Sequence, residues 1–147
     1  MMNQIEIRTV ALSDTKGIAE LNLELGYQTS NDVVEKQLKE VLATNDHYVL
    51  IAMNQEEIAG YIHAFRAVRL TTDTFIEIGA LIVKGNYRNQ GIGKQLVEHL
   101  QREVKDMNKI RVRCNVKRMA AHSFYSSLNF EEKKEQKIFD RKMGYDK

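Results

Sequence analysis

One continuous segment constrains the fold more than any other part of the chain. Residues 75–83, FIEIGALIV, are nearly all apolar, as in a central strand covered on both faces. Residues 87–96, YRNQGIGKQL, follow with two glycines and two basic residues but no acid. Apolar residues then recur at helical spacing as far as Leu100, which predicts a helix from Gly91 to about Met107. The sequence therefore places a helix N-terminus at the end of a sheet strand.

The remaining patterns predict one α+β domain over residues 1–147. One helix follows Ser13 and Asp14 and ends at Gly26, and a second is capped by Asn31 or Asp32. The second helix runs to about residue 42, and a short helix spans 119–128. Alternating or apolar runs predict the other strands at 4–10, 47–53, 58–69, 110–116, 130–134 and 137–143, the last two as a hairpin. The order βααβββαβαββ describes a mixed, mostly antiparallel sheet of about six to seven strands with about four helices.

Composition excludes several classes of protein. The chain has 22 basic and 20 acidic residues and a net charge of +2, too balanced to predict nucleic-acid binding. No apolar run approaches the length of a membrane span, and the first residues lack the pattern of a secretory signal. Cys114 is the only cysteine, which excludes an intrachain disulfide and favours a cytoplasmic location. The four histidines lack metal-ligand spacing, so we expect no metal site.

The glycine-rich turn predicts an anion site. The first turn of a helix has unpaired N–H groups and a partial positive charge, and glycine lets a phosphate approach the backbone. Arg88 and Lys94 would add charge-assisted hydrogen bonds. Neither familiar phosphate motif fits, because Leu96 replaces the third glycine of a dinucleotide fingerprint and a P-loop has different spacing. What remains is R-x-x-G-x-G, formed by Arg88, Gly91 and Gly93.

A second block, NVKRMAAHSFYSSLNF at residues 115–130, completes a resemblance. With the R-x-x-G-x-G turn, it resembles the GNAT superfamily of acetyl-CoA-dependent N-acetyltransferases. The block matches the later motif of that family, an asparagine, an aromatic–tyrosine pair and a terminal L-G-F. Asn129 replaces the glycine of that motif, and asparagine is the best other residue for a positive φ. The sequence looks most like a branch that includes aminoglycoside 6′-acetyltransferase-like proteins.

The resemblance implies that acetyl-CoA is the co-substrate and assigns residues to it. The turn would hold the pyrophosphate through Arg88, Asn89, Gln90, Gly91, Ile92, Gly93 and Lys94. The pantetheine arm would pair with the edge of the strand at Leu81, Ile82 and Val83 and lie against Asn115. Tyr125 would be the general acid that donates to the leaving thiolate.

The base is left open among three candidates. Glu77 stands in an apolar strand, where a carboxylate needs water, a partner or substrate. It is either a base, as in some members of the family, or a strand-end glutamate that lies in solvent or in a structural ion pair. His63 or a chain of waters would be the alternative base. Cys114 lies on the apolar face of its strand without an activating histidine, so direct transfer in a ternary complex is favoured over a covalent intermediate.

The function predicted from these residues is N-acetylation of a primary amine of a small molecule. Acetylation of a protein or peptide amine, or acyl-CoA binding by a regulatory module without turnover, are the alternatives. By resemblance the walls of the acceptor site come from the first two helices, their connecting loop and strand 58–69. Glu24, Tyr27 and Asp32 would meet a cationic amine there. We expect no nucleic-acid or membrane partner, and exposed sheet edges are compatible with a homodimer.

Overall fold

The computed structural model describes residues 4–144. It divides into two compact units, one ending at Arg113 and the other beginning at Cys114. The elements in chain order are β1 (Ile5–Thr9), η1 (Leu12–Asp14), α1 (Thr15–Glu24), α2 (Asn31–Leu42), β2 (His47–Asn54), β3 (Glu57–Ala67), β4 (Phe75–Val83), η2 (Gly85–Tyr87), α3 (Ile92–Glu103), β5 (Ile110–Val112) and α4 (Met119–Ser127).

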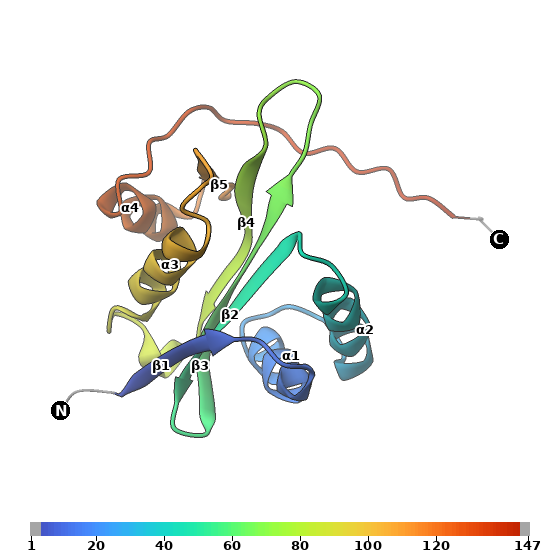
Figure 1. Cartoon of the computed structure of the whole chain (residues 1–147), viewed down its shortest axis with the longest axis vertical. Helices are drawn as coiled ribbons and strands as arrows, with labels where there is room; N and C mark the ends of the chain where they lie inside the picture. Colours follow the sequence, from blue (N-terminus) through green and yellow to red (C-terminus); the bar gives the residue numbers. More distant parts are fainter. Residues whose placement is uncertain (1–3, 145–147) are drawn as a thin grey trace. The chain divides into compact units, whose positions relative to one another are not determined.

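The first unit is a five-stranded sheet with helices on both faces. The strands lie in the order β1-β2-β3-β4-β5, and all neighbours are antiparallel except β4 and β5. The pair α1 and α2 lies on one face of the sheet and α3 on the other (Figure 1). The predicted α+β class, the four helices and the order of elements as far as α4 are confirmed.

Alternating side chains divide the core between the two faces. On the face of α1 and α2, the buried cluster joins Ile18, Ala19, Leu21, Val34, Leu38, Val49, Ile51, Tyr61 and Ile82. On the other face, the amphipathic stripe of α3 packs against β2, β3 and β4. Its residues Ile92, Leu96 and Leu100 are at most 1% exposed. This stripe fixes the start of α3 against the sheet, as the helical spacing predicted.

The predicted strands at 130–134 and 137–143 are wrong, because residues 128–144 contain no strand. Residues 131–137, EEKKEQK, are polar and exposed throughout, so they offer no face for a sheet to bury. The apolar residues beyond them are also exposed: Ile138, Phe139 and Met143. The sheet therefore has five strands in the described residues rather than six or seven.

The strand predicted at 110–116 is shortened for a local reason. β5 ends at Val112. Asn115 then accepts a hydrogen bond from the backbone N–H of Lys117 on its own Oδ1, 2.8 Å away. Its carbonyl accepts another from the N–H of Arg118 at 3.0 Å. This asparagine turn replaces the extended backbone that the alternation of residues predicted.

Several smaller features can be compared with the sequence. Ser30, not Asn31 or Asp32, caps α2, since its Oγ accepts from the N–H of Val33 at 3.2 Å. Gly26 and Asn129 have the positive φ expected of them, 93° and 70°. Within residues 4–144, no helix is long and apolar enough to cross a membrane.

Candidate active site

The strand–turn–helix segment forms a backbone cradle at the start of α3. Asn89 and Gly91 have φ values of 64° and 82°, which asparagine and glycine tolerate best. A Cβ at Gly91 would have no heavy atom within 4 Å, so the space beside this turn is open. Gly91 is the N-cap and gives the first turn no side-chain acceptor. The N–H groups of Ile92, Gly93 and Lys94 are therefore available to an anion.

Two cations flank this cradle. Arg88 and Lys94 are exposed, and neither forms an ion pair with any residue of 4–144. Gln90 ties the turn to the preceding loop by donating its Nε2–H to the carbonyl of Asn86 at 3.2 Å. All seven residues predicted to hold the pyrophosphate thus belong to one continuous turn whose charge is positive.

A polar network holds the loop before the cradle. The buried Tyr87 donates its hydroxyl hydrogen to Glu57 Oε1 and accepts from Asn54 Nδ2, each at 2.7 Å. Lys84 Nζ lies 2.6 Å from Glu57 Oε2. The hydrogen bonds that Glu57 accepts from Lys84 and from Tyr87 hold the pKa of its carboxyl group below the usual value. The loop is thereby fastened to the β2–β3 hairpin.

The edge of β4 opens beyond its contact with β5. β4 pairs with β3 along its length but with β5 only at Ile76–Ile78. The N–H of Lys84 donates to the carbonyl of Ala59 on β3 at 2.8 Å. Main-chain groups of a strand point to alternate sides, so those of Ile82, two residues earlier, also face β3. Those of Leu81 and Val83 face the other side, where no strand of the described chain pairs with them. Two of the three predicted residues therefore present main-chain hydrogen-bonding groups at an open edge.

Glu77 is the buried carboxylate of this sheet, 8% exposed. Its Oε2 accepts a hydrogen bond from Arg113 Nε at 2.9 Å, and Arg69 Nη2 lies 3.6 Å from Oε1. The second oxygen, Oε1, is buried and has no hydrogen bond within the described residues. An unsatisfied buried acceptor costs about 1–3 kcal/mol. Glu77 is thus in an ion pair rather than in solvent, and Oε1 is left for a further donor.

His63 has a partner that the sequence did not reveal. Its Nε2 lies 2.9 Å from Nδ1 of His47, in a hydrogen bond between the two rings. Burial, with a smaller contribution from the charge of His47, lowers the pKa of His63 to about 4. An imidazole of that pKa is a weak base near neutrality, which disfavours His63 as the proton acceptor.

The second unit contains the other predicted residues. The Asn115 side chain forms the turn described above, and His122 Nε2 lies 2.9 Å from its carbonyl oxygen. Tyr125 packs edge-on against Phe124 and Phe130, with ring centroids 5.0 and 5.4 Å away. Burial raises the pKa of Tyr125 to about 12, and its hydroxyl forms no hydrogen bond with residues 4–144. Burial also raises the pKa of the Cys114 thiol, which opposes a nucleophilic role.

The three residues suggested to meet a cationic amine, Glu24, Tyr27 and Asp32, share no hydrogen bond or ion pair within residues 4–144. Glu24 Oε1 lies 3.9 Å from Lys84 Nζ. Tyr27 is half exposed, and Asp32 lies exposed in the first turn of α2. The described residues also contain no group of three or more His, Cys, Asp or Glu side chains that would hold a metal ion.

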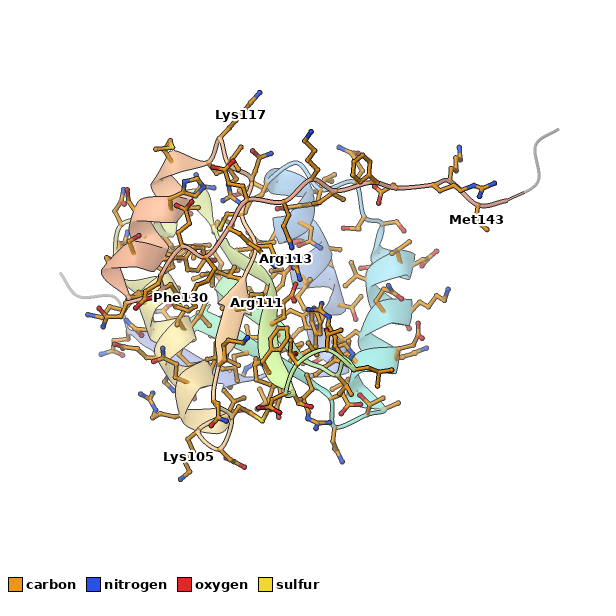
Figure 2. All side chains as sticks on the ribbon, turned by 90° about the horizontal axis from the view of Figure 1, so that it is seen from above. Lys105, Arg111, Arg113, Lys117, Phe130 and Met143 are labelled. Carbon is orange, nitrogen blue, oxygen red and sulfur yellow. The ribbon has the colours of Figure 1, made fainter. Side chains whose placement is uncertain are left out.

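The sequence did not identify Glu77 as the acid that Arg113 meets, nor Arg69 as a second cation near it. Arg111 and Arg113 lie two residues apart, in β5 and just after it (Figure 2). Phe75 and Glu77 are likewise two residues apart in β4. The parallel register pairs Glu77 with Arg111, so these side chains share a face. The alternation of residues 110–116, IRVRCNV, indicated that the two arginines share one face of a strand. It did not indicate that this strand lies beside β4 in a register that brings the arginines to Glu77.

Comparisons with known proteins place this architecture. The profile of the acetyltransferase (GNAT) domain family matches residues 16–142. A comparison with curated proteins gives no match. The chain belongs to the GNAT acetyltransferase family, as the turn at residues 88–94 and the block at 115–130 suggested.

Several solved structures share the fold. Aminoglycoside 6′-N-acetyltransferase AAC(6')-Ih from Acinetobacter baumannii is 16% identical with a TM-score of 0.83, covering 96% of this chain and 100% of its own. AAC(6')-Iy, in complex with a bisubstrate analog of coenzyme A and acetylneamine, is 20% identical with a TM-score of 0.81, covering 95% and 99%. Glucosamine-6-phosphate N-acetyltransferase from Arabidopsis thaliana is 23% identical with a TM-score of 0.79, covering 93% and 99%. At these identities the similarity is one of fold.

Proposed function

We propose that this protein transfers the acetyl group of acetyl-CoA to a primary amine of a small molecule, by direct transfer in a ternary complex. The observation that carries the proposal is the first turn of α3, which has no side-chain cap and follows the open edge of β4. Arg88 and Lys94 flank this turn, and neither forms an ion pair within residues 4–144. A cationic cradle and an extended edge suit a ligand with a pyrophosphate and an amide-bearing arm.

Each part of the ligand would meet a group of matching chemistry. The N–H groups of the α3 turn, with Arg88 and Lys94, would hold the pyrophosphate. The main-chain groups of Leu81 and Val83 would pair with the amides of the arm, and one N–H would polarise the thioester carbonyl. Ile82 would contribute packing, since its main chain faces β3. Asn115 keeps its assignment to the arm from the resemblance alone.

The reaction sets the remaining requirements. Bound acetyl-CoA supplies a thioester whose carbonyl carbon accepts the amine. A primary ammonium must lose a proton before its nitrogen can form the new C–N bond, and the C–S bond then breaks. The products are an amide, a thiol and one proton. The chain must therefore orient an amine, assist its deprotonation and stabilise a thiolate.

Glu77 would act on the amine through Oε1. Because this oxygen is buried without a hydrogen bond, an incoming N–H would satisfy it. The contact with Arg113 keeps the carboxylate oriented. We propose that Glu77 orients the amine and receives its proton, directly or through water.

Tyr125 would stabilise the leaving group. A phenol with a pKa of about 12 stays protonated at neutral pH. Complete transfer of its proton to a thiolate is unfavourable, because an ordinary thiol has a pKa of about 8.5. We therefore propose that Tyr125 donates a hydrogen bond to the sulfur, and that the thiol takes its proton from solvent or from the amine.

The direct test is incubation with acetyl-CoA and a broad panel of amines, with thiol release measured against time. Calorimetry with coenzyme A runs in parallel. Thiol release that depends on a small amine supports the proposal, and release only with peptides moves the acceptor to a protein amine. Binding of coenzyme A without turnover on any amine would favour the regulatory module. Absence of both binding and turnover would refute the proposal.

A further inference from the structure

A group of cations surrounds the ring of Phe75 on β4. The ring is buried, and Lys109 Nζ lies 4.7 Å from its centroid. The guanidinium carbons of Arg111 and Arg69 lie 4.6 and 5.2 Å from the same centroid. These distances are within the range of cation–π attraction. We call Arg69, Lys109, Arg111, Arg113, Glu77 and Phe75 together the Phe75 cluster.

The charges of the Phe75 cluster do not balance. Glu77 is its only carboxylate, and it contacts Arg113 and Arg69. Lys109 and Arg111 form no ion pair with any residue of 4–144, nor do Asp73 and Asp106 in the adjoining loops. Cations held around one ring repel one another unless an anion joins them. The cluster therefore has the electrostatics of a site for a negative group.

The cluster also has one buried acceptor, Oε1 of Glu77. Phe75 and Glu77 are two residues apart in β4, so their side chains lie on the same face of the sheet, which is the face that carries α1 and α2. Both lie in the half of β4 that is next to β5. Two residues along a strand span roughly 6.8 Å. One small molecule could therefore contact both parts of the cluster if its N–H donor and its negative group are separated by about this distance. The donor would meet Glu77, and the negative group would meet the cations.

We propose that the Phe75 cluster binds an oxyanion of the acceptor, so that the acceptor is an amine carrying a carboxylate or phosphate group. This inference rests on the proposed acetyltransferase function. The amine nitrogen donates to Glu77 Oε1, while Arg111, with Lys109 and Arg69, receives the oxyanion. Such an acceptor differs from the purely cationic amine for which Glu24, Tyr27 and Asp32 were suggested above.

The test measures binding, so that it does not depend on turnover. Calorimetry in saturating coenzyme A compares two pairs of amines of similar shape: 4-aminobutyrate with 4-aminobutanamide, and O-phosphoethanolamine with ethanolamine. We expect at least one anionic member to bind about 10- to 100-fold more tightly than its neutral partner, the range of one charge-assisted hydrogen bond. The first pair tests a carboxylate and the second a phosphate.

Variants then assign the preference to the Phe75 cluster. Arg111→Met should remove most of the difference within the preferred pair, and Lys109→Gln should reduce it with less risk to the packing over Phe75. Arg111→Lys, which keeps the charge, should retain part of it. Arg102→Met is the matched control, because Arg102 is exposed on α3 and contacts His99 there.

Two results would overturn the inference. One is equal or weaker binding of both anionic amines relative to their neutral partners. The other is a preference that Arg111→Met and Lys109→Gln leave intact while both proteins still melt cooperatively. Failure of the proposed function has a different signature, which is the absence of thiol release with every amine whatever the binding preference.

Discussion

Replacing Gly91 separates backbone strain from ligand binding at the α3 cradle. Gly91 has a φ of 82°, and a Cβ there would meet no heavy atom within 4 Å. Gly91→Ala therefore creates no clash in the free protein, and its cost is the left-handed backbone alone, about 1 kcal/mol. For a chain of this size that corresponds to a fall in Tm of roughly 2–4 °C.

The same Cβ enters the space that a phosphate would occupy. Loss of one charge-assisted hydrogen bond is worth about 1.5–3 kcal/mol, which is about a 10- to 100-fold rise in the Kd of coenzyme A. Calorimetry gives the Kd, and urea unfolding gives the stability. Gly91→Asn extends the comparison, since asparagine tolerates positive φ but is bulkier. It should lose less stability than the alanine variant and bind coenzyme A no better.

Gly26 supplies a matched control. Its φ is 93°, and a Cβ there would also meet nothing within 4 Å, but it lies at the end of α1. Gly26→Ala should lose a similar free energy of unfolding and leave the Kd of coenzyme A unchanged. If Gly91→Ala and Gly26→Ala change the Kd equally, or neither changes it, the cradle does not hold the phosphate.

The remaining predictions concern single side chains. Tyr125→Phe should lower kcat about 10-fold or more with little change in the Kd of coenzyme A, as expected for a donor acting on the leaving group; steady-state kinetics with calorimetry checks this, and an unchanged kcat refutes it. Glu77→Gln should lower kcat/KM most at low pH, where the amine is hardest to deprotonate; a pH–rate profile that merely shifts downward uniformly points to another base. His63 takes up a proton near pH 6.5 when unfolded but only near pH 4 when folded, so stability should fall with decreasing pH in that window by at most about 1.4 kcal/mol per pH unit. His63→Gln should flatten this slope in urea unfolding. Asp14 is 6% exposed and accepts two hydrogen bonds from Arg8, at 2.8 and 2.9 Å, which hold its pKa below the usual value; Asp14→Asn should cost about 2 kcal/mol at pH 7, and the wild-type advantage should vanish as pH falls below the usual aspartate range.

The parts of the fold that were predictable are those with a strong local pattern. The apolar run 75–83 became β4 with the same bounds, and helical spacing after Gly91 became α3. Both patterns are enforced by burial on one or two faces, which the sequence expresses directly. By contrast, residues 131–137 are polar and exposed, and the apolar residues Ile138, Phe139 and Met143 are exposed as well, so burial does not enforce the predicted hairpin.

The partners of the site residues were not predictable in the same way. Glu77 and Arg113 are 36 residues apart, and their contact depends on the parallel register of β4 and β5. The register of the β2–β3 hairpin places His47 opposite Phe65. His63 is two residues from Phe65 on the same face of β3, so its ring comes within hydrogen-bond distance of His47. In each case the residue type was visible in the sequence, whereas the pairing follows from strand register, which a single sequence leaves open.

A one-residue irregularity decides which main-chain groups face the open edge of β4. The N–H of Ile76 donates to the Lys109 carbonyl at 3.0 Å, so its main-chain groups face β5. If the main-chain groups alternated regularly from Ile76 onward, those of Ile82 would also face the β5 side. Those of Leu81 and Val83 would then face β3. Instead the register shifts between Ile78 and Ala80, leaving Gly79 as the extra residue of a β-bulge. The bulge reverses the alternation at the point where β5 ends. Leu81 and Val83 thus gain outward N–H and C=O groups, while the Ile82 side chain enters the core beneath α1 and α2.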